Sequence, residues 1–374
     1  MIQRPELANI RRIVIKVGTA QITRKGVIDE DRIEELCNII AGLRRTYEVI
    51  LVSSGAIAAG IAQAGLQVKK SLSIPYKQAA AAIGQTSIMK LYVRYLSKHN
   101  IPAGQILLGA DVLQHKERYR NARNTIKTLL KIGALPIVNE NDTVSIDEIK
   151  VGDNDKLAAM VSQVADADLL IILSDVDGFY RDFNDPEKRQ LIDQLSSIDE
   201  SVREQALPTQ NNTATGGMIT KLDAARMCLG SGIDMVLANG KDLSIIHRIL
   251  AGEKTGTFFY AAETPESGHK VWLRHHLVCR GRISVDAGAK EALCERGTSL
   301  LPKGITSVDG NFDAGDGVSI VGPDNEVFAC GICSFGRQEL EAIVGMHSDE
   351  VKSTLGPDSA TVAVHRDNLV LNEE

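Results

Sequence analysis

Two lysines in this sequence lie beside glycine turns, a combination that suits the binding of phosphate groups. Lys16 ends an apolar run and precedes Gly18, while Lys221 follows Gly216 and Gly217 by about one helical turn. A glycine turn that opens a helix presents backbone N–H groups to an anion, and a nearby ammonium group adds a positive charge. The pattern therefore indicates a polyphosphate site, although a solvated lysine at a strand or helix end explains either position taken alone.

Acidic and amide residues form two clusters that can serve the same site. Asn139 to Asp142 follow an apolar strand-like run, and ten residues later Gly152 to Asp155 open an expected helix. Such side chains can bind a substrate ammonium, orient a lysine or help to hold Mg2+ through water. The alternative for Asp153 or Asn154 is a helix N-cap. The presence of both clusters favours a functional role.

Two further strand-like runs end in small or hydroxyl-bearing residues. One continues into Ser53-Ser54-Gly55-Ala56, which indicates either an anion site at a helix N-terminus or a tight turn with a serine cap. The other ends in Ser174-Asp175. Phosphoryl transfer needs cations for the equatorial oxygens, backbone donors for the bridging phosphates and a metal ion. The lysines, glycine turns and polar clusters together match that requirement.

Strands and helices alternate over residues 12–260 and must position these groups. Short β-branched runs predict strands, and apolar residues at i, i+3, i+4 and i+7 predict helices between them. This alternation predicts an α/β fold, with a mostly parallel sheet sandwiched by helices and ligands bound at the carboxyl ends of its strands. The strand-like runs are Ile13–Ile15, Val49–Val52, Gln105–Leu108, Leu135–Val138, Leu169–Leu173 and Met235–Leu237. One amphipathic helix is expected from the spacing of Leu157, Met160, Val161 and Val164.

The pattern changes after residue 260, which divides the chain into two parts. Residues 261–278 include a polar stretch with Pro265 and are expected to form a linker. From 279 to 374, short runs are punctuated by glycines, which predicts a small β-rich domain. That part holds 8 Lys and Arg against 16 Asp and Glu, a net charge of -8. Since the whole chain carries -6, residues 1–278 carry about +2.

Composition narrows the class of protein. The chain has 374 residues, of which 44% are hydrophobic and 24% charged, as in ordinary globular proteins. No uncharged apolar run approaches the roughly 18 residues of a membrane span, and the start of the chain has no signal-peptide pattern. The six cysteines are widely spread, so we expect a cytoplasmic protein with reduced thiols. The motif G-x-x-x-x-G-K-[ST] is absent, which excludes the P-loop class.

The order and spacing of the motifs resemble the amino acid kinase family, and together with the C-terminal part the resemblance covers nearly the whole chain. The segments that carry the resemblance are Lys16–Thr19, Ser53–Gly60, Asn139–Asp142, Lys150–Asp155 and Thr215–Lys221. The C-terminal part resembles a PUA domain through Val285–Ala289 and Ser299–Ile305. The resemblance implies a kinase domain at residues 1–260, a linker at 261–278 and a small β-rich PUA-like barrel at 279–374.

Within that family, the arrangement is similar to bacterial enzymes that phosphorylate the γ-carboxylate of L-glutamate. This similarity implies that ATP is the phosphoryl donor and that L-glutamyl 5-phosphate is formed, the first step of proline biosynthesis. It also implies Mg2+ as a cofactor, proline as a feedback inhibitor and a homo-oligomer. Neither a nucleic acid nor a membrane is expected as a partner.

The resemblance assigns roles to individual residues. Lys16, Lys221 and Asp155 would be catalytic, with both lysines at the ATP phosphates and Asp155 ordering a lysine or the substrate ammonium. Ser54, Asp142 and Asn154 would bind glutamate. The nucleotide would contact Lys16, Ser174, Asp175, Thr215, Gly216, Gly217, Met218, Ile219, Thr220 and Lys221. Two positions depart from the family pattern: Ser174 replaces a usual threonine, and Ala214 replaces a usual glycine, which puts the detailed loop conformation in question.

Two other functions stay open. One is a kinase of the same family with a different acceptor, such as N-acetylglutamate, although an acylated amine would have less use for the acidic and amide clusters. The other is an RNA-binding or RNA-modifying protein, which the PUA-like part suggests. Its 16 acidic against 8 basic residues argue against RNA, because phosphate neutralisation dominates affinity for nucleic acids.

Overall fold

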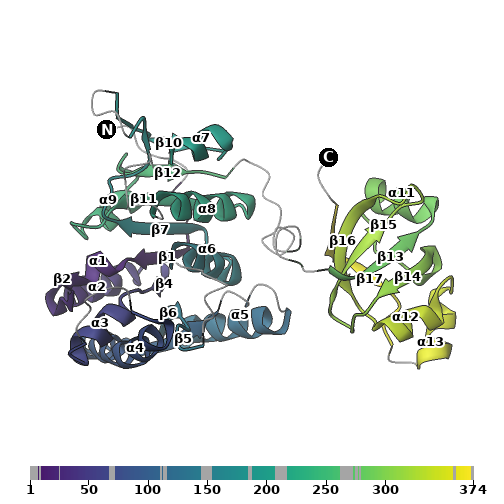
Figure 1. Cartoon of the computed structure of the whole chain (residues 1–374), viewed down its shortest axis with the longest axis horizontal. Helices are drawn as coiled ribbons and strands as arrows, with labels where there is room; N and C mark the ends of the chain where they lie inside the picture. The colour runs from purple at the N-terminus through teal and green to yellow at the C-terminus, as the bar shows by residue number, and fades with distance from the viewer. Residues whose placement is uncertain are drawn as a thin grey trace. The chain divides into compact units, whose positions relative to one another are not determined.

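The computed structural model describes residues 7, 10–24, 26–66, 72–109, 112, 116–144, 154–183, 188–206, 217–261, 273, 277, 279–356 and 359–371. The chain divides into two compact units, one made of residues 1–112 and 119–265 and the other of residues 113–118 and 266–374 (Figure 1). Within the described residues, no helix combines the length and the apolar character needed to span a membrane.

An eight-stranded sheet organises the first unit, in the order β10-β12-β11-β7-β1-β4-β6-β5. Neighbouring strands are parallel except β11 and β12, which are antiparallel. All six strand-like runs of the sequence lie in this sheet, so the prediction of a mostly parallel sheet is confirmed. The strands are β1 (Arg12–Val17), β4 (Glu48–Val52), β5 (Ala103–Leu108), β6 (Leu135–Glu140), β7 (Leu169–Ser174), β10 (Gln194–Leu195), β11 (Asp234–Asn239) and β12 (Thr257–Phe259).

Helices cover both faces of this sheet (Figure 1). Ile13, Ile15 and Val17 of β1 belong to one apolar cluster with α2, α4 and α9, so the alternation of a strand directs Lys16 to the opposite face, toward α6. The helices that lie wholly or mostly in this unit are α1 (Thr19–Ile22), α2 (Glu30–Leu43), α3 (Ala56–Gln63), α4 (Ile74–Ser97), α5 (Lys116–Lys131), α6 (Asn154–Ala165), α7 (Glu200–Gln205), α8 (Gly217–Gly230) and α9 (Ile245–Leu250). Two short hairpins pair β2 (Thr23–Arg24) with β3 (Val27–Ile28) and β8 (Tyr180–Arg181) with β9 (Gln190–Leu191).

Helix α6 is buried on nearly all sides. Every residue from Asp155 to Ala165 is buried except Lys156. The apolar spacing in the sequence predicts an amphipathic helix there. The prediction of a helix is confirmed, but the expected solvent-exposed side is also buried, because α8 packs over it. Gln163 takes part in that contact, since its Nε2 donates to the carbonyl oxygen of Met227 in α8 at 3.1 Å and to Oγ of Ser231, just after the helix, at 2.7 Å. A helix buried all round is fixed by its neighbours rather than by a solvent-facing side.

Helices α3 and α4 touch backbone to backbone. A Cβ atom on Gly60 would lie 1.7 Å from the carbonyl oxygen of Ala80, and one on Gly84 would lie 1.8 Å from that of Ala56. The small residues Ala56 and Gly60 after β4 therefore allow α3 and α4 to pack closely, in addition to following the turn that the sequence predicts. Gly55 forms that turn with a φ of 90°, a conformation that glycine adopts without strain.

A five-stranded sheet, β14-β13-β15-β16-β17, organises the second unit. Its neighbours are antiparallel except β13 and β15, so the prediction of a small β-rich domain is confirmed. The turn after β13 leads into α11 because the Asp286 side chain accepts from the N–H of Ala289 at 2.7 Å. The elements are β13 (Cys279–Val285), α11 (Ala287–Arg296), η4 (Pro302–Gly304), β14 (Ile305–Gly310), β15 (Gly317–Val321), β16 (Val327–Cys333), α12 (Arg337–Ile343), α13 (Ser348–Leu355) and β17 (Val364–Leu371).

Candidate active site

The three predicted catalytic residues, Lys16, Asp155 and Lys221, meet near the carboxyl end of β1. Nζ of Lys16 lies 2.5 Å from Oδ1 of Asp155, and Nζ of Lys221 lies 3.0 Å from Oδ2 of the same carboxylate. The Asp155 side chain is fully buried, and the two lysine side chains are only 6% and 9% exposed. Two positive charges and one negative charge give the cluster a net charge of +1, which favours an anion such as a phosphate beside it.

The packing of three elements brings these groups together. Lys16 points from β1 toward α6, and Asp155 lies in the first turn of α6, where the helix dipole stabilises a carboxylate. Lys221 lies one turn into α8, and its ammonium also donates to the carbonyl of Gly217 at 2.9 Å. A Cβ on Gly18 would come within 2.7 Å of Oε1 of Gln21 and 3.7 Å of the Lys16 ammonium. Glycine thus keeps the backbone close to this positive charge.

An amide hub lies one residue before the shared carboxylate. Nδ2 of Asn154 lies 2.6 Å from the carbonyl oxygen of Ser53, 2.8 Å from Oγ of Ser54 and 2.8 Å from Oδ1 of Asn139. Nδ2 of Asn139 in turn donates to Oε1 of Gln85 at 2.6 Å. These contacts tie the start of α6 to the ends of β4 and β6. Two predicted substrate-binding residues, Ser54 and Asn154, are therefore in contact with each other, and Asn154 directly precedes Asp155 of the lysine–aspartate cluster.

A buried tyrosine supports the turn after β4. Tyr92 of α4 is fully buried, and its hydroxyl forms a 2.9 Å hydrogen bond with Oγ of Ser53. Burial raises the pKa of this phenol well above its ordinary value, so the hydroxyl stays protonated. The sequence carries no local signal for this role, because an aromatic residue in an apolar helix is typical of a core position.

We expect Tyr92→Phe to remove this hydrogen bond while keeping the packing of the ring. The Ser53 hydroxyl loses a buried partner, which costs about 1 kcal/mol of unfolding free energy and lowers Tm by roughly 2–4 °C. Thermal unfolding measures the change. Tyr92→Leu is the control, since it also leaves a cavity and should lose about 3 kcal/mol. Unchanged stability in Tyr92→Phe, beside a clear loss in Tyr92→Leu, would contradict a role for the hydroxyl.

The ends of β7 and β11 form a polar rim beside this cluster. Oγ of Ser174 donates to Oδ1 of the exposed Asp175 at 3.1 Å, and Ser174 pairs in register with Asn239. Nδ2 of Asn239 donates to Oδ1 of Asp177 at 2.8 Å. That hydrogen bond, with a second from Tyr180, holds the pKa of Asp177 below its ordinary value. The sequence reasoning missed Asn239, although it follows a strand-like run in the same way as Ser174.

The other predicted site residues lie around this cluster or outside the described residues. Asp142 lies half-buried in the turn after β6, and burial raises the pKa of its carboxyl; a bound cation would lower it again. Oγ1 of Thr220 lies 3.5 Å from Oδ2 of Asp155. Met218 and Ile219 are half-buried in the first turn of α8. Thr215 and Gly216 lie outside the described residues, as do Ala214 and the segment 150–153.

Comparison with known proteins shows the family to which the chain belongs. The amino acid kinase family matches residues 11–239, more than half of the chain, and the PUA domain matches residues 281–355. The chain belongs to the amino acid kinase family.

Curated relatives in the amino acid kinase family match along nearly the whole chain. The proteins named glutamate 5-kinase from Trichlorobacter lovleyi and Syntrophotalea carbinolica are 44% and 43% identical to it, over 98% of this chain and 98% and 99% of theirs. The protein named glutamate 5-kinase from Pelobacter propionicus is 40% identical, over 97% of this chain and 98% of the relative. The solved structure of UMP kinase from Bacillus anthracis matches with a TM-score of 0.46 and 16% identity, covering 67% of this chain and 96% of that one. Within the family, the chain therefore groups with the glutamate 5-kinases.

Proposed function

We propose that this chain transfers the γ-phosphoryl group of ATP to the γ-carboxylate of L-glutamate, giving L-glutamyl 5-phosphate, the first step of proline biosynthesis. The observation that carries the proposal is the buried cluster of Lys16, Asp155 and Lys221 beside the Asn154 hub. The name glutamate 5-kinase shared by relatives at 40–44% identity supports the choice of acceptor.

The two lysines hold and neutralise the phosphates in this mechanism. Phosphoryl transfer has little covalent chemistry for the protein to perform, so positioning and charge stabilisation supply most of the rate. Asp155 contacts both ammonium groups and therefore keeps them at a fixed separation, ready for the equatorial oxygens of the transferring group. Ser174, Asp175 and the start of α8, from Gly217 to Lys221, line the nucleotide site in this mechanism. Thr215 and Gly216 are predicted to take part, but they lie outside the described residues.

The acceptor needs no general base. A glutamate side chain has an ordinary pKa near 4.3, so it is already ionised at neutral pH and is itself the nucleophile. Ser54 and Asn154 supply hydrogen-bonding groups next to the lysine cluster, and Asp142 supplies a carboxylate for the free α-ammonium. A substrate with an acylated amine would leave that carboxylate without its cation.

The donor set suits Mg2+ that arrives with the nucleotide. Among the residues that the structure describes, no group of three or more His, Cys, Asp or Glu side chains is arranged to hold a metal ion. Mg2+ commonly binds through one or two carboxylates while phosphate oxygens and water complete its six positions. Asp175, exposed at the end of β7, is such a carboxylate. The ion would neutralise charge on the phosphates.

The proposal is tested by ADP release from ATP and Mg2+ with the purified chain. We expect turnover with L-glutamate to exceed turnover with N-acetyl-L-glutamate by about 100-fold or more, since the site would bind a free ammonium. Trapping the product with hydroxylamine should give the γ-hydroxamate of glutamate. Turnover only with the acetylated substrate, or with neither, would refute the assignment. Two related proposals are inhibition by proline, measured in the same assay, and a homo-oligomer, measured by light scattering.

A further inference from the structure

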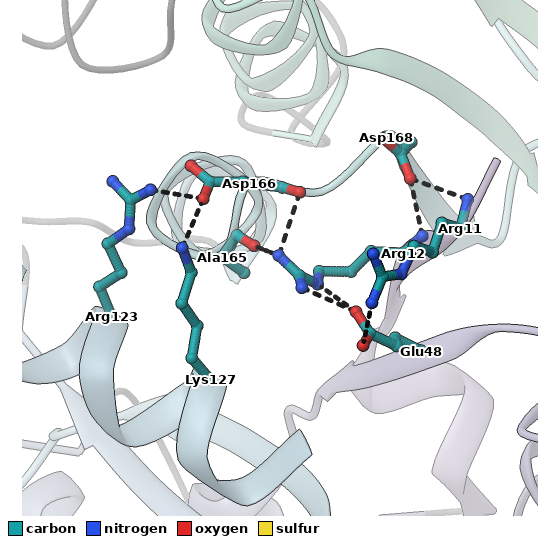
Figure 2. Close-up of polar contacts among 8 residues, drawn as sticks. All are labelled: Arg11, Arg12, Glu48, Arg123, Lys127, Ala165, Asp166 and Asp168. Carbon is teal, nitrogen blue, oxygen red and sulfur yellow. Dashed lines mark hydrogen bonds and ion pairs between the residues drawn. The ribbon is translucent and has the colours of Figure 1, made fainter. Parts of the chain in front are cut away.

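A network of charged residues holds the end of α6 that is remote from the active site (Figure 2). The helix ends at Ala165, and Asp166 follows with a φ of 50°. The N–H of Ala167 donates to the carbonyl of Ser162 at 2.9 Å, and that of Asp166 to Gln163 at 3.3 Å, which is a Schellman end. These two bonds occupy earlier carbonyls and leave those of Ala165 and Asp166 for other donors.

Arg12 supplies these donors from the first residue of β1. Its Nη1 donates to the carbonyl oxygen of Ala165 and, at 3.3 Å, to that of Asp166. Its Nε and Nη2 donate to Oε2 of Glu48 at 2.9 and 2.7 Å. The Arg12 side chain is only 15% exposed, so the planar guanidinium has one orientation. A cation at a helix C-terminus also interacts favourably with the helix dipole.

The charges around this guanidinium are balanced by acidic residues from neighbouring elements. Burial alone would raise the pKa of Glu48, but its hydrogen bonds and charge interactions with Arg12 and Arg11 outweigh burial and hold the pKa below its ordinary value. Asp166 binds two cations of α5, Arg123 at 2.5 Å and Lys127 at 2.9 Å. The left-handed residue that ends α6 is thereby fixed from a second side (Figure 2).

Strand β1 thus contacts both ends of the same helix. Arg12 and Lys16 lie on one face of β1 and are four residues apart, a distance of about 13 Å along a strand. Asp155 and Ala165 are ten residues apart, about 15 Å along a helix. The two spacings nearly match, so Lys16 can pair with Asp155 at one end while Arg12 binds the carbonyls at the other.

We propose that Arg12 is a positioning residue for phosphoryl transfer, because it fixes where α6 lies along its own axis. The apolar packing around α6 has little directional preference, whereas the hydrogen bonds at its end are directional. A slide of about 1 Å would disturb both ion pairs of Asp155, and such misplacement can cost up to roughly 100-fold in rate. This inference rests on the proposed function.

Arg11 provides a matched control for Arg12. Within the described part of the chain, its side chain contacts Oε1 of Glu48 at 3.2 Å and is 78% exposed. The backbone N–H groups of both arginines donate to Oδ2 of Asp168, at 2.8 and 2.7 Å, and survive side-chain substitution. Arg11→Met and Arg12→Met therefore each remove one positive charge beside Glu48, but only Arg12→Met frees the end of α6.

The test compares kcat, both KM values and hydrogen exchange of α6 in the two variants, at a temperature at which thermal unfolding shows both to be folded. We expect Arg12→Met to lower kcat about tenfold, with a smaller change in the KM for ATP, and to speed exchange in peptides that cover residues 154–165. Arg11→Met should stay within about twofold of the unmodified chain in every quantity. Equal kcat and equal exchange in the two variants would overturn the proposal, even if Arg12→Met alone lowered Tm.

A second pair of variants covers the case in which Arg12→Met does not fold. Arg12→Lys keeps the charge, but one ammonium group cannot reach Glu48 and both carbonyls at once; kcat should fall about two- to fivefold, and Arg11→Lys should leave it unchanged. Equal kcat in these two variants would overturn the proposal. Hydrogen exchange needs no substrate, so it tests the anchor separately. An unmodified chain that is inactive on glutamate refutes the proposed function, not the anchor.

Discussion

Replacing Lys221 with methionine is expected to lower kcat by about 100- to 1,000-fold, the loss typical when one charge-stabilising donor is removed from a transition state. Methionine keeps most of the aliphatic stem and removes the ammonium. The fold should survive because Asp155 keeps Lys16 as a partner at 2.5 Å. No buried charge is left alone, so the unfolding free energy should change by only about 1 kcal/mol.

The chain offers a matched control for this substitution on α6. Asp223 also lies between two cations, with Lys156 at 2.8 Å and Arg203 at 2.7 Å. Lys156→Met therefore also removes one of two lysine or arginine partners of an aspartate, but its side chain is 36% exposed and is not part of the buried cluster. We expect it to change kcat by no more than about threefold. If Lys221→Met kept a tenth of the activity or more, or if Lys156→Met lost as much, the catalytic role of Lys221 would be wrong.

The sequence predicted which residues meet at the site because of how parallel sheets are built. Lys16, Asp155 and Lys221 lie far apart in the chain, yet each ends a strand or opens a helix, and the carboxyl ends of parallel strands share one edge. The sequence could not show that a single carboxylate bridges both lysines. That arrangement depends on how closely α8 packs on α6, which no local pattern encodes.

Other parts of the site had no readable signal. Tyr92 and Gln85 of α4 support the site through Ser53 and Asn139, but in the sequence they belong to a helix with no distinguishing motif. The sequence also gives no sign that Gly60 contacts α4, because this contact depends on how two helices pack in the folded chain. Arg12 was equally hidden, because an arginine at the start of a strand is ordinarily a solvated residue. Its role depends on the far end of a helix about 150 residues away.

Replacing Asp155 with asparagine should damage stability and catalysis together, unlike the loss of either lysine. The carboxylate is fully buried between two ammonium groups, and without its charge these groups repel each other. Removing one partner of a buried ion pair commonly costs about 3–5 kcal/mol, and we expect a loss in that range from denaturant unfolding. Activity of the folded fraction should fall at least as far as in Lys221→Met, because neither lysine is then held in place. A stability equal to that of the unmodified chain would show that the carboxylate does not hold the lysines.

The double variant Asp155→Asn with Lys221→Met separates these two effects. In Asp155→Asn, the two ammonium groups face each other without the carboxylate. Removing one of them with Lys221→Met relieves their repulsion, so the double variant should regain about 2 kcal/mol of the unfolding free energy lost in Asp155→Asn. It should remain inactive. The two substitutions are then strongly non-additive in stability, as expected for residues in direct contact. Additive losses of unfolding free energy would instead mean that Lys16, Asp155 and Lys221 do not interact as one electrostatic unit. The net positive charge inferred for the site depends on that interaction and would then be unsupported.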